Sequence, residues 1–114
     1  ENRKFDDGIA LGGWPIDYHN PNVVGGFNNL RTVGVYDIPY RTLLPKNVDN
    51  LLVAGRCHSA DQMAAASTRV SQTASLMGEA AGRAAALAYK SRVMPRDVDG
   101  AAVRRELLKH GAIL

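Results

Sequence analysis

The 114-residue sequence has one cysteine, and only 6% of its residues are aromatic. Cys57 has no second cysteine to pair with, which excludes a disulfide framework and a cysteine zinc site within the chain. A lone thiol fits a reducing compartment, so the location stays open with the cytoplasm preferred. No stretch approaches the length of a membrane span and no signal peptide is recognisable, so we expect no membrane partner.

The sequence also lacks any long run of one charge sign. Its formal net charge of +3 is compatible with nucleic-acid binding. However, the basic residues are mixed with acids, as in Arg96-Asp97 and Arg104-Arg105-Glu106, and few aromatic residues lie among them. We therefore interpret the charges as a solvated surface and expect no nucleic-acid partner.

The apolar content is ordinary, but it contains few large side chains. Hydrophobic residues make up 46% of the chain and charged residues 22%, which is typical of a globular protein. The length allows one small domain with limited burial. Because alanine supplies much of the apolar count, we expect a thin core.

Two patterned stretches form the centre of the sequence. Asn50–Gly55 is a short apolar run after a turn signal, which predicts a buried strand. Across Arg69–Lys90, apolar residues recur at three- and four-residue spacing, which predicts a long helix of small residues. Gly78 and Gly82 share one face of this helix and together cost about 2 kcal/mol of helix propensity relative to alanine. We therefore expect a sheet or another helix to pack closely on that face.

Four motifs in order resemble one known family. They are Ile38–Pro45 (IPYRTLLP), Asn50–Cys57 (NLLVAGRC), Ala66–Val70 (ASTRV) and Met77–Ala85 (MGEAAGRAA). Several motifs in the correct order are much more specific than a single glycine pattern. Over roughly residues 38–89 the chain is similar to the closing segment of the FAD-dependent oxidoreductase family.

The resemblance implies an α/β fold. The chain would be the C-terminal fragment of a Rossmann-like FAD-binding domain, with short strands, a long helix rich in alanine and glycine, and a C-terminal packing helix. Residues 1–35 would be a remnant of a substrate domain and residues 36–92 the closing strand and helix of the FAD-binding domain. Residues 93–114 would form a C-terminal helical tail.

One expected motif is missing. Flavoproteins of this kind seat the pyrophosphate on a helix N-terminus after a GxGxxG turn. No such pattern occurs in these 114 residues, and the first residue is not methionine. We therefore expect the C-terminal piece of a longer enzyme, with the N-terminal FAD-binding portion as its partner. FAD then belongs to the intact enzyme, which needs no metal, and the piece alone is expected to bind FAD weakly or not at all.

Asp17 and His19 are the candidate catalytic pair. If residues 16–19 are extended, these two side chains point to the same face. A carboxylate beside an imidazole fixes its tautomer, as a general acid or base requires. Members of the resembling family carry a similar Pro-x-Asp-x-His stretch, which favours this role. The alternative is a surface pair that organises a turn.

The turn after the predicted strand is the first candidate cofactor contact. Gly55 lets the backbone turn or a cofactor approach closely. Many flavoproteins have an acid next, which binds a ribityl hydroxyl; the resembling family allows Arg56, which would contact the pyrophosphate or a loop carbonyl. We interpret Cys57 as a small buried group and His58 as a surface or substrate-specific histidine. Asp61 is a ribityl or loop ligand, or else a turn-forming residue.

The start of the long helix is the second candidate cofactor contact, and Ser67 or Thr68 is placed to cap it. In related flavoproteins this helix end faces the N1–C2=O edge of the isoalloxazine, where free N–H groups and the positive dipole end stabilise the reduced flavin. The resemblance therefore implies cofactor contacts for Ser67, Arg69 and Val70. Arg69 would alternatively hold an anionic substrate, or be a surface residue at a mildly unfavourable end of the helix dipole.

Two further elements are predicted from local patterns. Residues 32–38 alternate enough for a half-buried strand. For the following Arg41, we favour a local ion pair with Asp37 or Asp49 over contact with a substrate carboxylate or a flavin phosphate. Near the end of the chain, Asp99 is a suitable N-cap and Gly111 suits a left-handed C-terminal position, which predicts a packing helix without chemistry.

The leading functional hypothesis is redox catalysis. The intact enzyme would move a hydride or an electron pair between a small organic substrate and flavin. The alternative is a non-catalytic α/β interaction or oligomerisation module, whose exposed alanine-rich helix would form the surface of a homo-oligomer.

Overall fold

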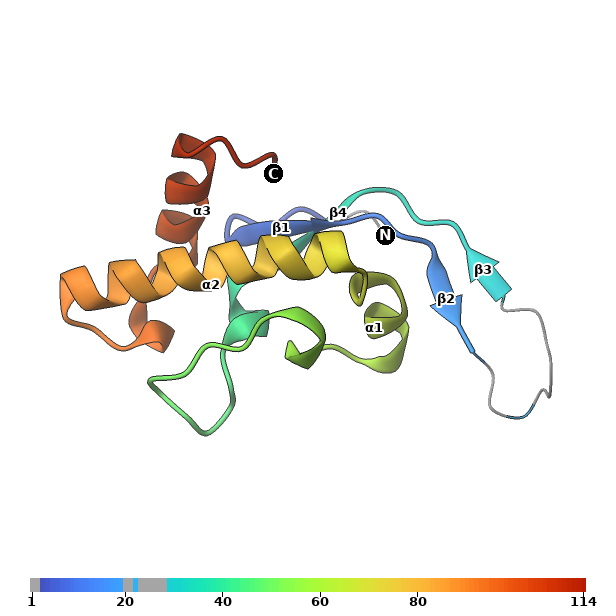
Figure 1. The fold of residues 1–114 in the computed structure, drawn as a ribbon, viewed down its shortest axis with the longest axis horizontal. Coiled ribbons are helices and arrows are strands. Elements are labelled where there is room, and N and C mark those ends of the chain that lie inside the picture. Colours follow the sequence, from blue (N-terminus) through green and yellow to red (C-terminus); the bar gives the residue numbers. More distant parts are fainter. Residues whose placement is uncertain (1–2, 20–21, 23–28) are drawn as a thin grey trace.

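A computed structural model describes residues 3–19, 22 and 29–114. The described residues form small strands and three α-helices (Figure 1). The elements are β1 (Gly8–Gly12), β2 (Ile16–Tyr18), β3 (Asn29–Arg31), β4 (Tyr36–Pro39), η1 (Tyr40–Leu43), η2 (Gly55–Cys57), α1 (Gln62–Thr68), α2 (Ser71–Ser91), η3 (Pro95–Asp97) and α3 (Gly100–Lys109), the η elements being 3₁₀-helices. The expected α/β class is confirmed, including the long helix rich in alanine and glycine and the helix near the C-terminus.

The strands form two separate antiparallel ladders. β1 pairs with β4 from Gly12 opposite Tyr36 to Gly8 opposite Pro39, with a bulge after Gly8. β2 pairs with β3 through Asp17 opposite Leu30. In Figure 1, β1 and β4 lie along α2, whereas β2 and β3 extend from one end of the molecule. This arrangement carries Asp17 to the same end of the molecule as α1.

α2 is the longest element, and one of its faces covers the core. It packs against β1 and against α3, which crosses it near its middle (Figure 1). The residues that α2 contributes to the core are mostly alanines, so the neighbouring elements approach the helix closely. The buried core cluster comprises Ile9, Ala10, Ile38, Tyr40, Leu43, Met77, Ala80, Ala84, Val103 and Leu107. Three of these ten residues are alanines, and the expectation of a thin core stays a prediction.

α3 has the ends that the sequence predicts. The Asp99 carboxylate accepts a hydrogen bond from the Ala101 N–H at 3.0 Å, as an N-cap does. Gly111 follows the helix with a φ of +88°, in the left-handed region that favours glycine. Val103 and Leu107 are fully buried between these ends, so α3 is a packing helix.

The strand predicted at residues 50–55 does not form. Residues 51–54 lie outside every ladder, and Leu51 is 45% exposed. A buried strand needs neighbours that complete its hydrogen bonds. Here the Val53 N–H donates to the Leu43 carbonyl at 2.9 Å, but no strand of the described chain lies alongside. The strand predicted at residues 32–38 is likewise confined to β4, because its partner β1 ends opposite Tyr36.

The predicted long helix begins later and has a separate helix before it. α1 ends at Thr68, Arg69 and Val70 form the junction, and α2 follows. The close neighbour expected at Gly78 and Gly82 is not found among the described residues, because a Cβ atom added at either glycine meets nothing within 4 Å. This face of α2 is open to solvent.

The division of the chain into three segments stays a prediction. β1 of the first segment pairs with β4 of the second, and α3 of the third packs against both α2 and β1. As for the membrane, no helix formed by the described residues has the length and apolar character needed to cross a bilayer.

Candidate functional site

The N-terminus of α2 is exposed and has no side-chain cap. Its N-cap residue, Val70, is extended and makes no capping hydrogen bond through its side chain. Ser71 and Gln72, in the first helical turn, are exposed. The first N–H groups of any α-helix have no partner within the helix, and the dipole gives this end partial positive charge. The α2 N-terminus therefore favours an anionic or electron-rich group.

Ser67 and Thr68 do not cap α2, so this prediction is wrong. Both lie in the last turn of α1 and are buried. The Tyr36 hydroxyl donates to Ser67 Oγ at 2.5 Å, and Ser67 Oγ donates to the Trp14 carbonyl at 2.5 Å. The Ser67 hydroxyl therefore joins α1 to β4 and to the segment before β2, and a cofactor contact for Ser67 stays a prediction.

The turn η2 lies beside the first turns of α2. Gly55 has a φ of +74°, and a Cβ added there would lie 3.9 Å from Ala74 Cβ. Arg56 Nε donates to the Arg69 carbonyl at 3.1 Å, so Arg56 contacts a loop carbonyl, one of its two expected partners. Cys57 is exposed, not buried as predicted. Gly55 and Arg56 thus come together with the junction before α2.

Three of the predicted site residues form an acid–base cluster, which we define as Asp17, His19 and Arg69. Arg69 Nη2 lies 2.8 Å from Asp17 Oδ2, although the two residues are 52 positions apart. His19 Nε2 lies 3.5 Å from Asp17 Oδ1, an atom that is buried and has no hydrogen-bond donor among the described residues. The pairing matches the extended conformation of β2, which puts Asp17 and His19 on the same face.

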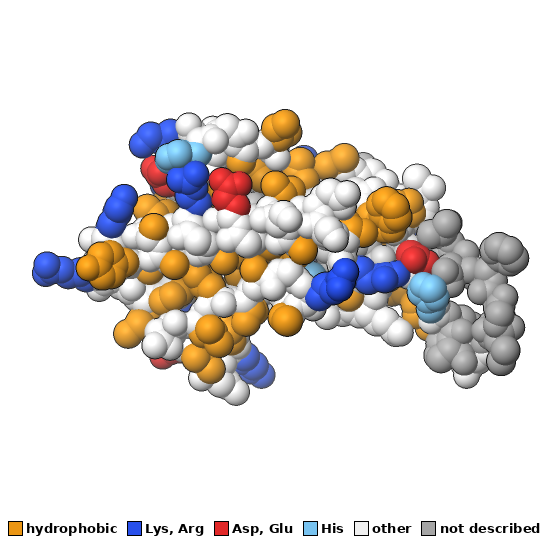
Figure 2. Space-filling model, viewed as in Figure 1, with side chains coloured by type: hydrophobic (Ala, Val, Ile, Leu, Met, Phe, Trp, Pro, Cys, Tyr) orange, Lys and Arg blue, Asp and Glu red, His pale blue; other side chains and the backbone are white. Residues whose placement is uncertain are grey.

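The acid–base cluster is open to solvent. It borders a shallow hollow of about 220 Å³ between β2 and α1, which Gln62 and Ala65 also line. Figure 2 shows basic, acidic and histidine side chains next to one another toward the right of the view, where α1 and β2 lie in Figure 1. The His19 side chain is 67% exposed and that of Arg69 46%, so both are accessible to a small molecule.

His58 is buried, so its interpretation as a surface histidine is wrong. It is 8% exposed, with Nδ1 2.7 Å from the Gly55 carbonyl oxygen and Nε2 3.0 Å from Thr68 Oγ1. Sequence reasoning missed this contact because no local pattern relates residue 58 to residue 68. Asp61 caps α1, accepting from the Ala64 N–H at 2.7 Å, which matches the turn-forming alternative.

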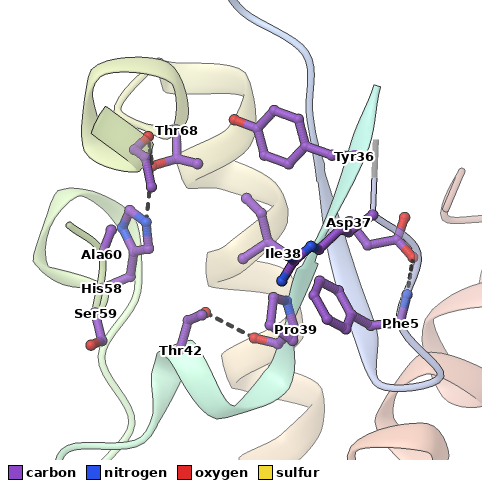
Figure 3. A pocket seen from close by; sticks show the side chains of 12 residues that line it. Phe5, Tyr36, Asp37, Ile38, Pro39, Thr42, His58, Ser59, Ala60 and Thr68 are labelled. Atoms are coloured by element: carbon purple, nitrogen blue, oxygen red, sulfur yellow. Dashed lines mark hydrogen bonds between the residues drawn. The ribbon is translucent and has the colours of Figure 1, made fainter. Parts of the chain in front are cut away.

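A second cavity of about 220 Å³ lies between β4, η1 and α1 (Figure 3). Its wall is mostly apolar, with Phe5, Ile38 and Pro39 on one side and His58 on the other. The Thr42 hydroxyl in the wall already donates to the Pro39 carbonyl at 2.9 Å. The cavity is therefore an apolar recess next to the η2 turn, without a free cluster of polar groups.

Arg41 has a different partner from those predicted. Arg41 Nη1 pairs with Asp7 Oδ2 at 3.1 Å, and its guanidinium lies 4.8 Å from the centre of the Phe5 ring. Asp49 pairs with Arg96 instead, at 2.8 Å. Asp37 is held by other cations, so the predicted local pairs of Arg41 are wrong, although its structural role is as expected.

The comparisons with known proteins identify the family. A family model described as FAD dependent oxidoreductase matches residues 1–107, which include every motif and candidate site residue discussed above. No curated protein and no solved structure gives a match. Among the described residues, no group of three histidine, cysteine or acidic side chains is placed to hold a metal ion. The match covers nearly the whole chain and confirms the resemblance seen in the motifs: the chain belongs to the FAD dependent oxidoreductase family.

Proposed function

We propose that the chain forms the flavin-facing part of an oxidoreductase that moves a hydride or an electron pair between a small organic substrate and FAD. One observation carries the proposal: the uncapped α2 N-terminus lies beside Gly55 and next to the acid–base cluster. Family membership supports FAD-dependent redox chemistry in general. The substrate and the roles of individual residues are parts of the proposal.

The residues present fit one edge of a flavin better than they fit the whole of FAD. Uncapped N–H groups of the α2 N-terminus and a glycine at positive φ offer hydrogen-bond donors with little steric hindrance. The GxGxxG turn that would bind the pyrophosphate is not in the sequence. We therefore propose an N-terminal FAD-binding portion as the partner of this chain. When bound, the flavin supplies the group that accepts and returns two electrons.

The chain itself would provide positive charge. The N–H groups of Ser71, Gln72 and Thr73 and the charge of Arg69 favour negative charge next to the α2 N-terminus. A cation at this end of a helix is unfavourable by itself, and the Asp17 carboxylate 2.8 Å from Arg69 offsets that cost. Asp17 thereby holds Arg69 in place beside the junction.

Asp17 and His19 would handle the substrate proton. The imidazole of His19 would accept or return a proton at Nδ1, because its Nε2 faces the Asp17 carboxylate 3.5 Å away. Both groups border the solvent-accessible hollow beside α1. A small organic substrate would bind there, with Arg69 available to an anionic part of it.

A variant that closes the α2 N-terminus with its own side chain tests the proposal. Val70→Asp places a carboxylate at the N-cap. There it accepts hydrogen bonds from the free N–H groups, and its negative charge offsets the partial positive charge of the helix end. We expect Val70→Asp to raise the free energy of unfolding by about 1 kcal/mol. We also expect it to abolish the chemical-shift changes that millimolar FMN causes at the amides of Ser71–Thr73 in the ¹⁵N-labelled chain. FMN is the probe because it carries the ring without the pyrophosphate link.

Val70→Ala is the matched control, since it also removes the valine methyl groups but supplies no cap. It should keep the FMN response, and riboflavin, which carries the same ring without a phosphate, should produce it too. The proposal fails if FMN leaves the amides of Ser71–Thr73 unchanged in the original chain. A titration of FAD followed by flavin fluorescence should show no saturation at micromolar ligand; saturation there would contradict the dependence on a separate FAD-binding portion.

A further inference from the structure

The buried imidazole of His58 joins the two segments that meet at the α2 N-terminus. Its Nδ1 lies 2.7 Å from the carbonyl oxygen of Gly55, the first residue of η2. Its Nε2 lies 3.0 Å from Oγ1 of Thr68, the last residue of α1, and Figure 3 shows the ring pointing toward that hydroxyl. Arg69 follows Thr68 directly, so one ring connects the glycine turn to the junction before α2.

The contacts of His58 fix which nitrogen carries the proton. A carbonyl oxygen only accepts, so Nδ1 must be the donor to Gly55. Nε2 of the neutral ring is then an acceptor, and the Thr68 hydroxyl donates to it. If the ring is protonated, Nε2–H donates to Thr68 Oγ1 and the hydroxyl donates to the Ala64 carbonyl, which lies 3.0 Å away. The connection therefore exists in both protonation states.

Burial makes the hydrogen bond between His58 and Thr68 more persistent than the nearby bond between Arg56 and Arg69. Arg56 Nε also joins η2 to the junction, through the Arg69 carbonyl, but that bond is exposed and water competes for both groups. The bond between His58 and Thr68 is buried, where breaking it leaves polar groups without partners. The backbone N–H of His58 donates a second hydrogen bond to the Gly55 carbonyl at 3.1 Å.

We propose that His58 is a positioning residue for the α2 N-terminus. By holding the Gly55 carbonyl and the Thr68 hydroxyl together, it fixes the glycine turn relative to the helix end that would face the flavin. His58 acts through these two residues and does not itself contact a ligand. The importance of this positioning for flavin binding rests on the proposed function, but the contacts of His58 with Gly55 and Thr68 can be measured without a flavin.

The test uses the full 114-residue chain and nuclear magnetic resonance. Long-range ¹H–¹⁵N correlation at a pH that leaves the ring neutral should show His58 with the proton on Nδ1. His58→Phe fills a similar volume without hydrogen bonds and should shift the amides of residues 55–57 and 69–73, while those of α3 stay in place. It should also weaken FMN binding at the α2 N-terminus by about tenfold. His58→Asn, whose amide can still donate to the Gly55 carbonyl, should restore the amides of residues 55–57.

His110→Phe is the matched control, because His110 Nδ1 also lies near a backbone carbonyl, that of Glu106 at 2.8 Å, but at an exposed position directly after α3. It should leave the α2 N-terminus unchanged. If His58→Phe does not fold, Thr68→Val and Thr68→Ser replace it: the first should move the junction amides and the second should not. A proton on Nε2 of neutral His58, or a loss of stability without a selective change at residues 69–73, would overturn the inference. If FMN leaves the original chain unchanged, the proposed function fails at this helix end, whereas the tautomer and the amide shifts still decide the role of His58.

Discussion

The buried carboxylate of Asp37 connects the N-terminal segment, β4 and α3. Lys4 Nζ lies 2.7 Å from Oδ1, the Phe5 N–H donates to Oδ2 at 3.0 Å, and Arg104 Nη1 lies 3.9 Å from Oδ2. Burial raises the pKa of Asp37, but the hydrogen bonds from Lys4 and Phe5 and the charges of Lys4 and Arg104 together lower it below its ordinary value of 3.8.

We predict that Asp37 makes the stability of the chain sensitive to acid. Because the pKa is lower in the folded state, the unfolded state takes up protons first as the pH falls. The stabilisation from ionised Asp37 is therefore complete above the unfolded value of 3.8 and is lost as the pH falls through the folded pKa. Asp37→Asn should lower the free energy of unfolding at neutral pH by about 2 kcal/mol. It should also flatten the dependence on pH in the acid range, measured by urea unfolding at several pH values.

Asp6→Asn is the control for Asp37→Asn, since it removes the same charge from an exposed position in the same segment. It should change the stability at neutral pH by less than about 0.5 kcal/mol. An Asp37→Asn chain that loses stability in acid as steeply as the original would contradict the role given to Asp37.

Single residues also show which contacts a sequence can predict. Asp17 and His19 lie two positions apart, so strand geometry alone places them on one face. The partner of Asp17 on the other side is Arg69, and nothing local relates two residues separated by 52 positions. The prediction for His58 is wrong for the same reason, because its burial depends on its contact with Thr68 at the end of α1. Local geometry was readable from the sequence, whereas ion pairs and buried histidines depended on the tertiary fold.

Among the secondary-structure elements, α2 keeps two glycines on a face that none of the described residues covers. Helix propensity makes each glycine about 1 kcal/mol less favourable than alanine, and here no close packing offsets the cost. We predict that Gly78→Ala and Gly82→Ala each raise the free energy of unfolding of the chain by about 1 kcal/mol, measured by urea unfolding.

A third glycine provides the opposite expectation. A Cβ added at Gly100 would lie 2.7 Å from Asp7 Cβ and 2.9 Å from Tyr40 Cβ, so Gly100→Ala must displace a packed element and should destabilise the chain. If Gly78→Ala and Gly82→Ala also destabilise the chain, the open face of α2 is contradicted, because that result would mean that another part of the chain packs against these glycines. In an assembly with a partner on this face, the same two substitutions would weaken association while stabilising the free chain.

The elements differ in how far local sequence determines them. The ends of α3 follow from Asp99 and Gly111, whose preferences are local, and both were predicted correctly. The apolar run at residues 50–55 was predicted as a strand, but a strand is stable only beside other strands, and the described chain offers it none. The junction at Arg69 and Val70 was missed because Ser67 and Thr68 resemble N-caps, although both are the last residues of a preceding helix.

At the scale of the whole molecule, the chain exposes more surface than its mass requires. Its accessible surface is 7415 Å², whereas a folded monomer of 12.3 kDa is expected to expose about 6,100 Å². Its radius of gyration is 15.1 Å, against about 13 Å for a compact domain of this length. The excess of about 1,300 Å² exceeds the roughly 800 Å² that each partner buries in a standard protein interface. This surface is sufficient for a partner, either a separate FAD-binding portion or a second copy of the chain.

Exposed apolar side chains around the C-terminal end of α2 make self-association the expected behaviour of the chain when it is alone. Tyr89 is 86% exposed, and Val93 and Met94 are exposed beside it and border the same hollow. We predict that the mass measured by sedimentation equilibrium rises above 12.3 kDa as the concentration increases. The double variant Tyr89→Ser and Met94→Ser should return it toward the monomer, whereas Lys90→Ser, on the same turn, should not. A mass that stays at the monomer value would contradict this prediction and count against the homo-oligomeric module. It would leave a separate FAD-binding portion as the proposed partner for this surface.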